Sequence, residues 1–142
     1  MSTDLFVDTS VLLTAVGGRH PARSSCQALV ASVDHIGTRL HISAETVQEF
    51  LYHRMRMGSH TDALEEVRAV RSAVVAHALD DAVIDAALRL VEQGPVRGRD
   101  AMIAATAMVH GFDAIVTLDR DFDAIPGLRR LEPSEAARAL GR

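Results

Sequence analysis

Two aspartates in this sequence directly follow short apolar segments. Asp8 comes after residues 5–7, and Asp119 comes after residues 115–118. Both segments are too short for a helix and have the composition of buried strands. The carboxyl ends of parallel strands meet at one edge of a sheet, where such sheets bind ligands, so we expect both carboxylates at that edge. Each has a structural alternative, since Asp8 could cap the next helix and Asp119 could shape a turn.

Two further acids are expected to reach the same edge from helices. Asp100 opens a helix whose apolar side must pack on the sheet, although an acid in a first turn also favours the helix dipole. Glu45 and Glu49 are four residues apart and share a helix face. The dipole accounts for Glu45, whereas Glu49 stands in mid-helix beside apolar residues, where its charge needs a partner. The candidate catalytic residues are therefore Asp8, Glu49, Asp100 and Asp119.

A group of four carboxylates needs a cation. Two unit charges about 4 Å apart repel by about 4 kcal/mol at an effective dielectric constant near 20. Oxygen ligands favour Mg²⁺ or Mn²⁺, and no two of the seven histidines have the spacing of a zinc motif. An ion held in this way favours phosphoester hydrolysis, because it polarises the phosphate and activates a water. The hydroxyls of Thr9 and Thr117 flank the acids and could orient them, while threonine at a strand end also serves packing.

The elements that must position these acids alternate between strands and helices. The pattern predicts strands at 5–7, 40–42, 74–76 and 114–117, with an edge strand at 128–131. Helical spacing and capping residues predict helices at 11–16, 22–33, 44–55, 60–71, 82–92 and 100–110. Strands that are apolar throughout indicate a parallel sheet covered on both faces. The predicted fold is a three-layer α/β/α arrangement with a four- to five-stranded parallel sheet.

The composition limits the class of protein. A chain of 142 residues can bury one core and is too short to divide into two, so residues 1–142 are expected to form a single domain. No apolar run approaches the roughly 20 residues that span a bilayer, and Met1 to Asp4 lack the pattern of a signal peptide, so we expect a cytoplasmic protein. The net charge of −4 argues only against a strongly basic nucleic-acid binder, because all 15 basic residues are arginines, which can bind phosphate.

The acids and their neighbours together resemble the signature of the PIN-domain family. The resembling segments are Val7 to Ser10, Thr46 to Phe50, residues 100–107 and residues 116–122. Each segment is weak alone, but four in this order and at these distances are specific. The resemblance runs from about residue 5 to residue 122, and the compact length is most similar to the VapC toxins of type II toxin–antitoxin pairs.

This resemblance carries expectations for the site and for the partners. It implies a Mg²⁺ or Mn²⁺ site shared by Asp8, Glu49, Asp100 and Asp119. The family places the fourth acid variably, so Asp121 is an alternative to Asp119 as a metal ligand. The resemblance further implies endonucleolytic cleavage of RNA, inhibition by a VapB-type antitoxin that lies across the active-site groove, and a homodimer.

Other kinds of protein fit these residues less well. A response-regulator receiver needs a lysine late in the sheet, and the chain has none; a haloacid-dehalogenase-type phosphatase needs an acid where Ser10 stands. Two alternatives stay open, because carboxylates alone do not establish activity. One is a PIN fold that binds RNA or an antitoxin without cutting, and the other is a solitary RNA-processing nuclease.

Overall fold

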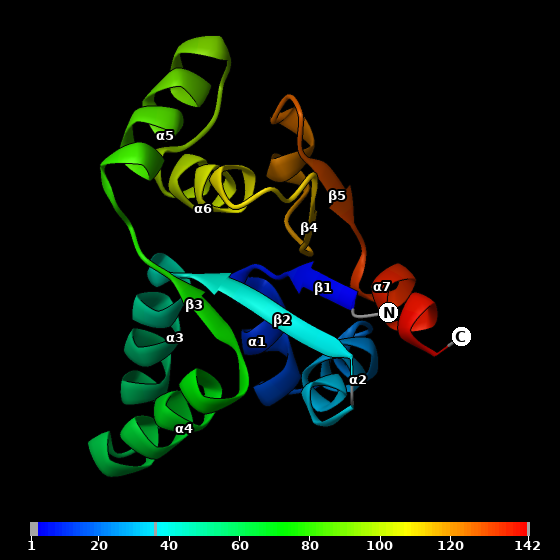
Figure 1. Cartoon of the computed structure of the whole chain (residues 1–142). Coiled ribbons are helices and arrows are strands. Elements are labelled where there is room, and N and C mark those ends of the chain that lie inside the picture. Colours follow the sequence, from blue (N-terminus) through cyan, green and yellow to red (C-terminus); the bar gives the residue numbers. More distant parts are fainter. Residues whose placement is uncertain (1–2, 36, 142) are drawn as a thin grey trace.

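The structure is a computed structural model that describes residues 3–35 and 37–141 (Figure 1). Met1 and Ser2, which contribute to the expectation that no signal peptide is present, lie outside these residues. The strands are β1 (Thr3–Phe6), β2 (Thr38–Ser43), β3 (Val75–His77), β4 (Ala114–Val116) and β5 (Arg129–Leu131). The α-helices are α1 (Thr9–Val16), α2 (Arg23–Ala31), α3 (Ala44–Met57), α4 (His60–Ala73), α5 (Asp81–Gln93), α6 (Gly98–Val109) and α7 (Pro133–Leu140), and the short 3-10 helices are η1 (Ser32–Asp34) and η2 (Arg120–Ala124). Within the described ranges, no helix is both long and apolar enough to cross a membrane.

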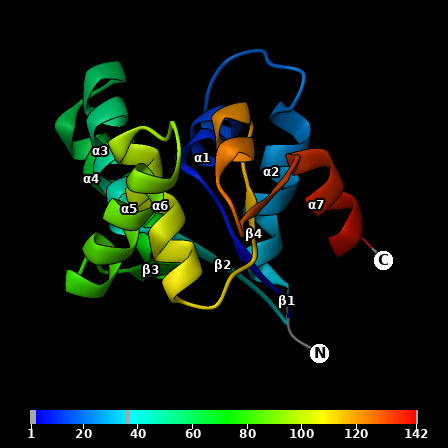
Figure 2. The same cartoon turned by 90° about the horizontal axis from the view of Figure 1, so that it is seen from above.

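The helix pattern matches the sequence expectations except near the carboxyl end. Each predicted helix is present, with the segment at 22–33 divided into α2 and η1. The sequence interpretation missed α7, although its start carries a readable signal. Pro133 occupies the first turn, and Glu132 and Glu135 form a capping box around it. Figure 2 shows α7 beside α2, away from α3 and α4.

The five parallel strands do not form one continuous sheet, so the expected four- to five-stranded sheet is found only in part. Strands β1, β2 and β3 form one sheet in the order β1-β2-β3, and β4 pairs with β5 in another. A single parallel bridge between Val7 and Val116 joins them, together with a 3.0 Å hydrogen bond from the Asp8 amide to the Val116 carbonyl. The pairing stops there because α1 begins at Thr9 and β4 is only three residues long. Figure 1 shows β4 and β5 running at a steep angle to β1.

The β1-β2-β3 sheet separates two hydrophobic cores. Successive residues of a strand point to opposite faces, so Phe6 joins the core that α5 and α6 cover, while Val7 joins the core shared with α1, α2 and α3. From β2, Leu40 and Ile42 are buried in this second core. Figure 1 shows α5 and α6 on one side of these strands and α1 to α4 on the other, which is an α/β/α layering.

The turn after α6 reverses the chain, so that β4 leads back toward the end of the sheet at which α6 begins. Gly111 has φ +86°, which favours glycine, and its amide donates to the Met108 carbonyl at 3.1 Å. The Phe112 amide donates to the Ala107 carbonyl at 3.0 Å, so the last turn of α6 is closed. Strand β4 then runs back along α6, and the residues that follow β4 approach the first turn of α6.

Phe122 holds η2 against the core, and its truncation should be costly. Its side chain is fully buried among residues of α5 and α6. We expect Phe122→Ala to lower the free energy of unfolding by about 3–5 kcal/mol, because it leaves a cavity. Urea unfolding followed by circular dichroism measures this change. Leu88→Ala, on the exposed side of α5, should change it by less than about 0.5 kcal/mol; equal losses in the two variants would contradict the anchoring role of Phe122.

Candidate metal centre

Three carboxylates from separate parts of the chain come together beside the first turn of α6. Asp100 lies in that turn, Asp119 follows β4 and Asp121 lies in η2. Each offers an oxygen within 4.8 Å of an oxygen of the other two. Asp100 is buried, Asp119 is partly buried and Asp121 is exposed. The two residues that the sequence left as alternatives for the fourth acid, Asp119 and Asp121, thus both lie beside Asp100.

Asp8 stands at the end of β1, and its side chain does not cap the helix that follows. It is the N-cap residue of α1, but the carboxylate makes no capping hydrogen bond. It is only 6% exposed and instead accepts a 2.7 Å hydrogen bond from Thr117 Oγ1. The same hydroxyl accepts from the Asp119 amide at 3.0 Å. Thr117 therefore links the two strand-end aspartates, and the threonine that the sequence offered as a supporting residue contacts both.

Asp119 uses its two carboxylate oxygens differently. Its Oδ1 accepts the Asp121 amide at 2.9 Å, which caps η2, so Asp119 does shape the turn as the structural alternative expected. Its Oδ2 faces the Arg97 guanidinium at 3.8 Å. One oxygen of Asp119 therefore fixes the loop while the other is turned toward the group of acids.

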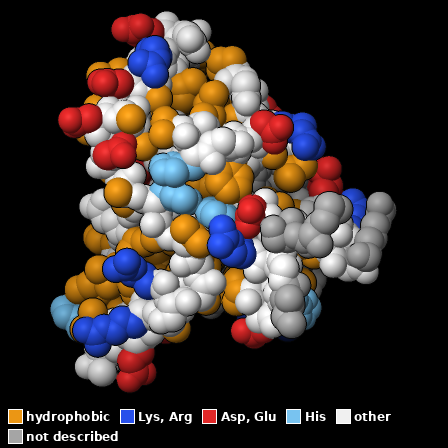
Figure 3. All heavy atoms as spheres, in the orientation of Figure 1, with side chains coloured by type: hydrophobic (Ala, Val, Ile, Leu, Met, Phe, Trp, Pro, Cys, Tyr) orange, Lys and Arg blue, Asp and Glu red, His pale blue; other side chains and the backbone are white. Residues whose placement is uncertain are grey.

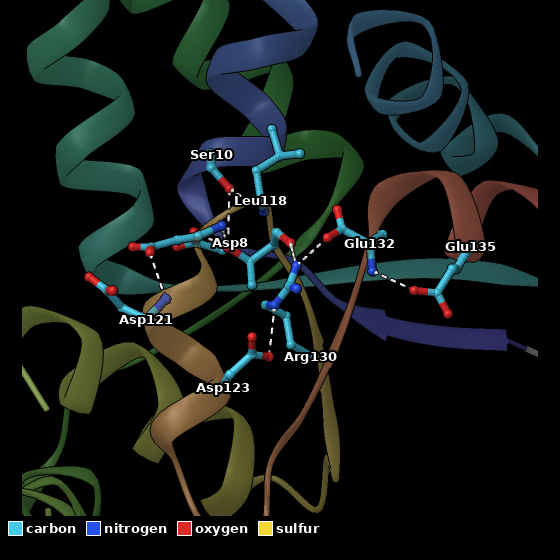
Figure 4. A network of polar contacts seen from close by, with 10 residues as sticks. Asp8, Ser10, Leu118, Asp121, Asp123, Arg130, Glu132 and Glu135 are labelled. Carbon is cyan, nitrogen blue, oxygen red and sulfur yellow. Dashed lines mark hydrogen bonds and ion pairs between the residues drawn. The ribbon is translucent and has the colours of Figure 1, made fainter. Parts of the chain in front are cut away.

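Ser10 and Arg130 support the loop that follows β4, and neither was predicted from the sequence to do so (Figure 4). The Ser10 hydroxyl lies 3.2 Å from Thr117 Oγ1 and accepts the Leu118 amide at 3.2 Å. Arg130, only 12% exposed, donates to the Thr117 carbonyl at 3.4 Å and to Glu132 at 2.6 Å. Its third partner is Asp123, at 2.9 Å. Ser10 holds the loop from α1 and Arg130 holds it from β5.

Glu49 lies near the three carboxylates but outside their group. It is partly buried on α3, and its Oε1 has no hydrogen-bond partner; the nearest cation is Arg99 Nε at 3.7 Å. Burial raises the pKa of Glu49, Arg99 opposes the shift, and the negative charges of Asp8 and Asp100 add to it. Glu49 therefore lies close enough to Asp8 and Asp100 for their negative charges to act on its carboxylate.

Thr9 connects α1 to α3, the helix that carries Glu49. Its hydroxyl donates to Thr46 Oγ1 at 3.0 Å, and Ser43 Oγ donates to the same oxygen at 3.2 Å. Ser43 also caps α3 by accepting the Thr46 amide at 3.2 Å. The sequence offered Thr9 as a supporting residue but gave no sign that Thr46 joins it to Ser43.

Glu45 differs from what its place in the first turn of α3 suggested. The helix dipole favours an acid there. However, both carboxylate oxygens are buried without a hydrogen-bond partner, and this burial raises the pKa of Glu45. The dipole therefore explains the residue type but not the burial. Among the described residues, Glu45 is not part of the three-acid group.

The surroundings of Asp100 fit a divalent cation. Burial raises the pKa of Asp100, and the Asp119 carboxylate raises it further, while Arg97 acts in the opposite direction. Its Oδ2 is buried and makes no hydrogen bond. A buried carboxylate oxygen that faces other carboxylates is stabilised by a cation, and oxygen ligands alone suit Mg²⁺ or Mn²⁺.

Acids of the candidate site line two separate hollows. One, of about 550 Å³, is lined in part by Arg97, Asp100 and Asp121. The other, of about 440 Å³, is lined in part by Glu49 and Arg99, together with residues of α3. Asp100 and Asp121 therefore border one hollow and Glu49 borders the other, and an arginine lines each.

Three of the seven histidines, which are far apart in the sequence, lie together in space. His41 Nδ1 lies 2.9 Å from His77 Nε2, and the His77 and His110 rings are 4.0 Å apart. Figure 3 shows histidine side chains gathered near the middle of one face. His110 ends α6 at the opposite end from Asp100, so these rings are remote from the acids. Within the described residues, no metal-binding group includes them.

Comparison with known proteins identifies the class. Residues 5–128 match the family model of the PIN domain. The chain therefore belongs to the PIN-domain family.

Within this family, the similar curated proteins are VapC ribonucleases. Ribonuclease VapC7 of Mycobacterium tuberculosis is 30% identical over 135 residues, covering 93% of both chains. Ribonuclease VapC13 of the same organism is 28% identical over 138 residues, which is 89% of this chain and 98% of that protein.

Solved structures share the fold. VapBC-1 from nontypeable Haemophilus influenzae aligns with a TM-score of 0.72 at 16% identity, covering 93% of this chain and 99% of that chain. DNA-bound VapBC from Salmonella typhimurium aligns with a TM-score of 0.71 at 22% identity, covering 94% and 99%. These likenesses establish the α/β fold with parallel strands.

The raised pKa of Asp100 predicts how stability depends on pH. Because the pKa is higher in the folded state than its usual value near 3.8, the ionised carboxylate destabilises the fold at neutral pH. This cost is present in full above the folded pKa and disappears as the pH falls toward 3.8. In chelator, Asp100→Asn should therefore unfold at higher urea concentration than the wild type at pH 7.5, by a margin that narrows at lower pH. A variant that is less stable at pH 7.5, or a margin independent of pH, would contradict this account.

Proposed function

We propose that this chain is a metal-dependent endoribonuclease, the toxin of a VapBC-type toxin–antitoxin pair. The observation that carries the proposal is the approach of oxygens from Asp100, Asp119 and Asp121 to within 4.8 Å of one another. The group lies where β4 ends and α6 begins, in a PIN-domain chain whose relatives are named ribonucleases. Such a group is suited to hold the ion that phosphoester hydrolysis needs.

Each acid has a proposed part in the reaction. Asp100, Asp119 and Asp121 hold a Mg²⁺ or Mn²⁺ ion, which when bound polarises the scissile phosphate and activates a water. Asp8 and Glu49 extend the set of carboxylates toward β1 and α3. The inclusion of Asp8 and Glu49 is supported by the pKa of Glu49, which burial raises and the charges of Asp8 and Asp100 raise further.

Two threonines have proposed positioning roles in the same reaction. Thr117 orients the Asp8 carboxylate through its 2.7 Å hydrogen bond. Thr9 fixes α1 to α3 through Thr46. The bond from Thr117 is made to an acid of the site, and bonds of this kind tune metal affinity and activity. Thr9 acts less directly, because it holds the helix that carries Glu49.

RNA has a proposed path across the two hollows that flank the acids. Arg97 lines one hollow and Arg99 lines the other. Guanidinium groups bind phosphate through paired N–H donors, so these arginines suit the nucleotides on either side of the cut. A chain of net charge −4 can bind RNA in this way because these arginines, together with the bound ion, would place positive charge where the phosphates lie.

A protein antitoxin is the proposed partner. Structure neighbours include a toxin–antitoxin complex from Klebsiella pneumoniae and the DNA-bound VapBC from Salmonella typhimurium. We infer that an antitoxin of the VapB type covers the hollows that RNA would enter. A cytoplasmic location and a homodimer belong to the same proposal.

A test of the enzymatic proposal is cleavage of a structured RNA by the purified chain. We expect cleavage with Mg²⁺ or Mn²⁺ and none with excess chelator. Asp8→Asn and Asp100→Asn should each lower the rate by more than about 100-fold, because loss of a mere supporting contact typically costs 10–100-fold. Thr117→Val should fall within that smaller range, while Thr117→Ser, which keeps the hydroxyl, should remain near wild type.

The matched control for these variants is Asp85→Asn, which removes the same charge from an exposed position on α5. Its rate should equal that of the wild type. Undiminished cleavage by an Asp8 and Asp100 double variant would rule out the proposed site. No cleavage under any metal condition would favour the alternative of a PIN fold that binds without cutting.

Growth assays test the toxin proposal separately from catalysis. Expression of the wild-type chain should arrest bacterial growth, and Asp8→Asn should not, because arrest depends on RNA cleavage. Co-expression of the short neighbouring gene, which we expect to encode a DNA-binding protein, should restore growth, and the two proteins should elute together on gel filtration. An active nuclease that lacks such a neighbour and causes no arrest would instead be a solitary RNA-processing enzyme.

A further inference from the structure

Arg97 contacts all three carboxylates of the candidate metal centre. It is the N-cap residue of α6, and its guanidinium forms an ion pair with Asp121. Its Nε lies 3.5 Å from Asp100 Oδ2, and its Nη2 lies 3.8 Å from Asp119 Oδ2. One monovalent cation of the chain itself therefore faces the same three acids that a divalent ion would use.

The oxygens that face Arg97 are those that the rest of the structure leaves available. Asp119 Oδ1 is engaged by the Asp121 amide, which leaves Oδ2. Asp100 Oδ2 is buried and makes no hydrogen bond, so its contact with Arg97 is electrostatic only. A divalent ion at these three residues would take the same oxygens, and steric and electrostatic repulsion would then displace the guanidinium.

The contacts of Arg97 are also easily broken. Its side chain is 65% exposed, and solvent-exposed ion pairs contribute little to stability. The guanidinium can rotate into the adjoining hollow of about 550 Å³, which Arg97 itself lines. Since a divalent ion attracts three carboxylates more strongly than a monovalent guanidinium does, the exchange favours the metal once enough of it is present.

We propose that Arg97 is a built-in competitor for the divalent cation, bound to Asp100, Asp119 and Asp121 until the ion displaces it. The inference rests on the proposed function, because it requires that these carboxylates bind a metal. Its consequence is that the site demands a higher metal concentration than the acids alone would need. Arg97 thereby sets the concentration of metal at which the centre fills.

The test is Mn²⁺ binding by the purified full-length chain, measured by calorimetry and by the rise in melting temperature on adding Mn²⁺. Arg97→Ala should bind Mn²⁺ roughly three- to tenfold more tightly than the wild type, the range expected from loss of a few exposed ion pairs. Arg97→Gln should behave alike. Arg97→Lys should fall between, because one ammonium cannot span three carboxylates.

Arg120→Ala is the matched control. Arg120 is exposed and lines the same hollow, yet among the described residues it forms no ion pair with these acids. Its loss changes the net charge equally and should leave Mn²⁺ affinity within about twofold. Equal tightening in Arg97→Ala and Arg120→Ala would indicate a general charge effect and overturn the proposal, as would unchanged or weaker binding in Arg97→Ala.

Asp100→Asn separates this inference from the proposed function. If Asp100→Asn weakens Mn²⁺ binding while Arg97→Ala fails to strengthen it, the metal centre stands and the competition by Arg97 is wrong. If neither the wild type nor Arg97→Ala binds Mn²⁺, both the metal centre and the competition are wrong. If Arg97→Ala binds Mn²⁺ more tightly and the added Asp100→Asn change abolishes that binding, both the metal centre and the competition by Arg97 are supported.

Discussion

Repulsion among carboxylates at the ends of β1 and β4 is the constraint on which the rest of this structure depends. Burial and the charge of Asp119 both raise the pKa of Asp100. Burial likewise raises the pKa of Glu49, and the charges of Asp8 and Asp100 add to this shift. A fold tolerates such a group only if other contacts hold the acids in place and cations offset their charge. Hydroxyl groups hold the acids in place, and arginines offset their charge.

The acids lie where the two sheets meet, and this is what creates room for them. The only pairing between the sheets within the described strands is the Val7–Val116 bridge, and Asp8 and Thr117 follow it directly. Beyond the bridge the chain segments separate, so the space at their ends is filled by side chains rather than by a further strand. The hydrogen bond from Thr117 to Asp8 then ties the two sheets together at the point where their backbones diverge.

The sequence predicted every α-helix except α7 and placed the strand-end acids, because those signals are local. Asp8 and Asp119 follow apolar segments, and Asp100 opens a periodic helix, so each could be placed from its neighbours. The supporting contacts could not, because they join residues far apart in the chain; Ser10 and Thr117, for example, are 107 positions apart. The break between the sheets was likewise hidden, since strand composition does not reveal how far two strands remain in register.

The arginines resolve the apparent conflict between an acidic chain and a phosphate substrate. Arg97 contacts three acids and Arg99 faces Glu49, so the carboxylates are already partly neutralised from both sides. Under the proposed function, a divalent ion would take over the neutralisation of Asp100, Asp119 and Asp121, and the positive charge of Arg97 would no longer be matched locally. The surface proposed to meet RNA would then become more positive when the centre fills. Metal binding and phosphate binding would in this way be coupled through one side chain, a link that the total charge of −4 does not reveal.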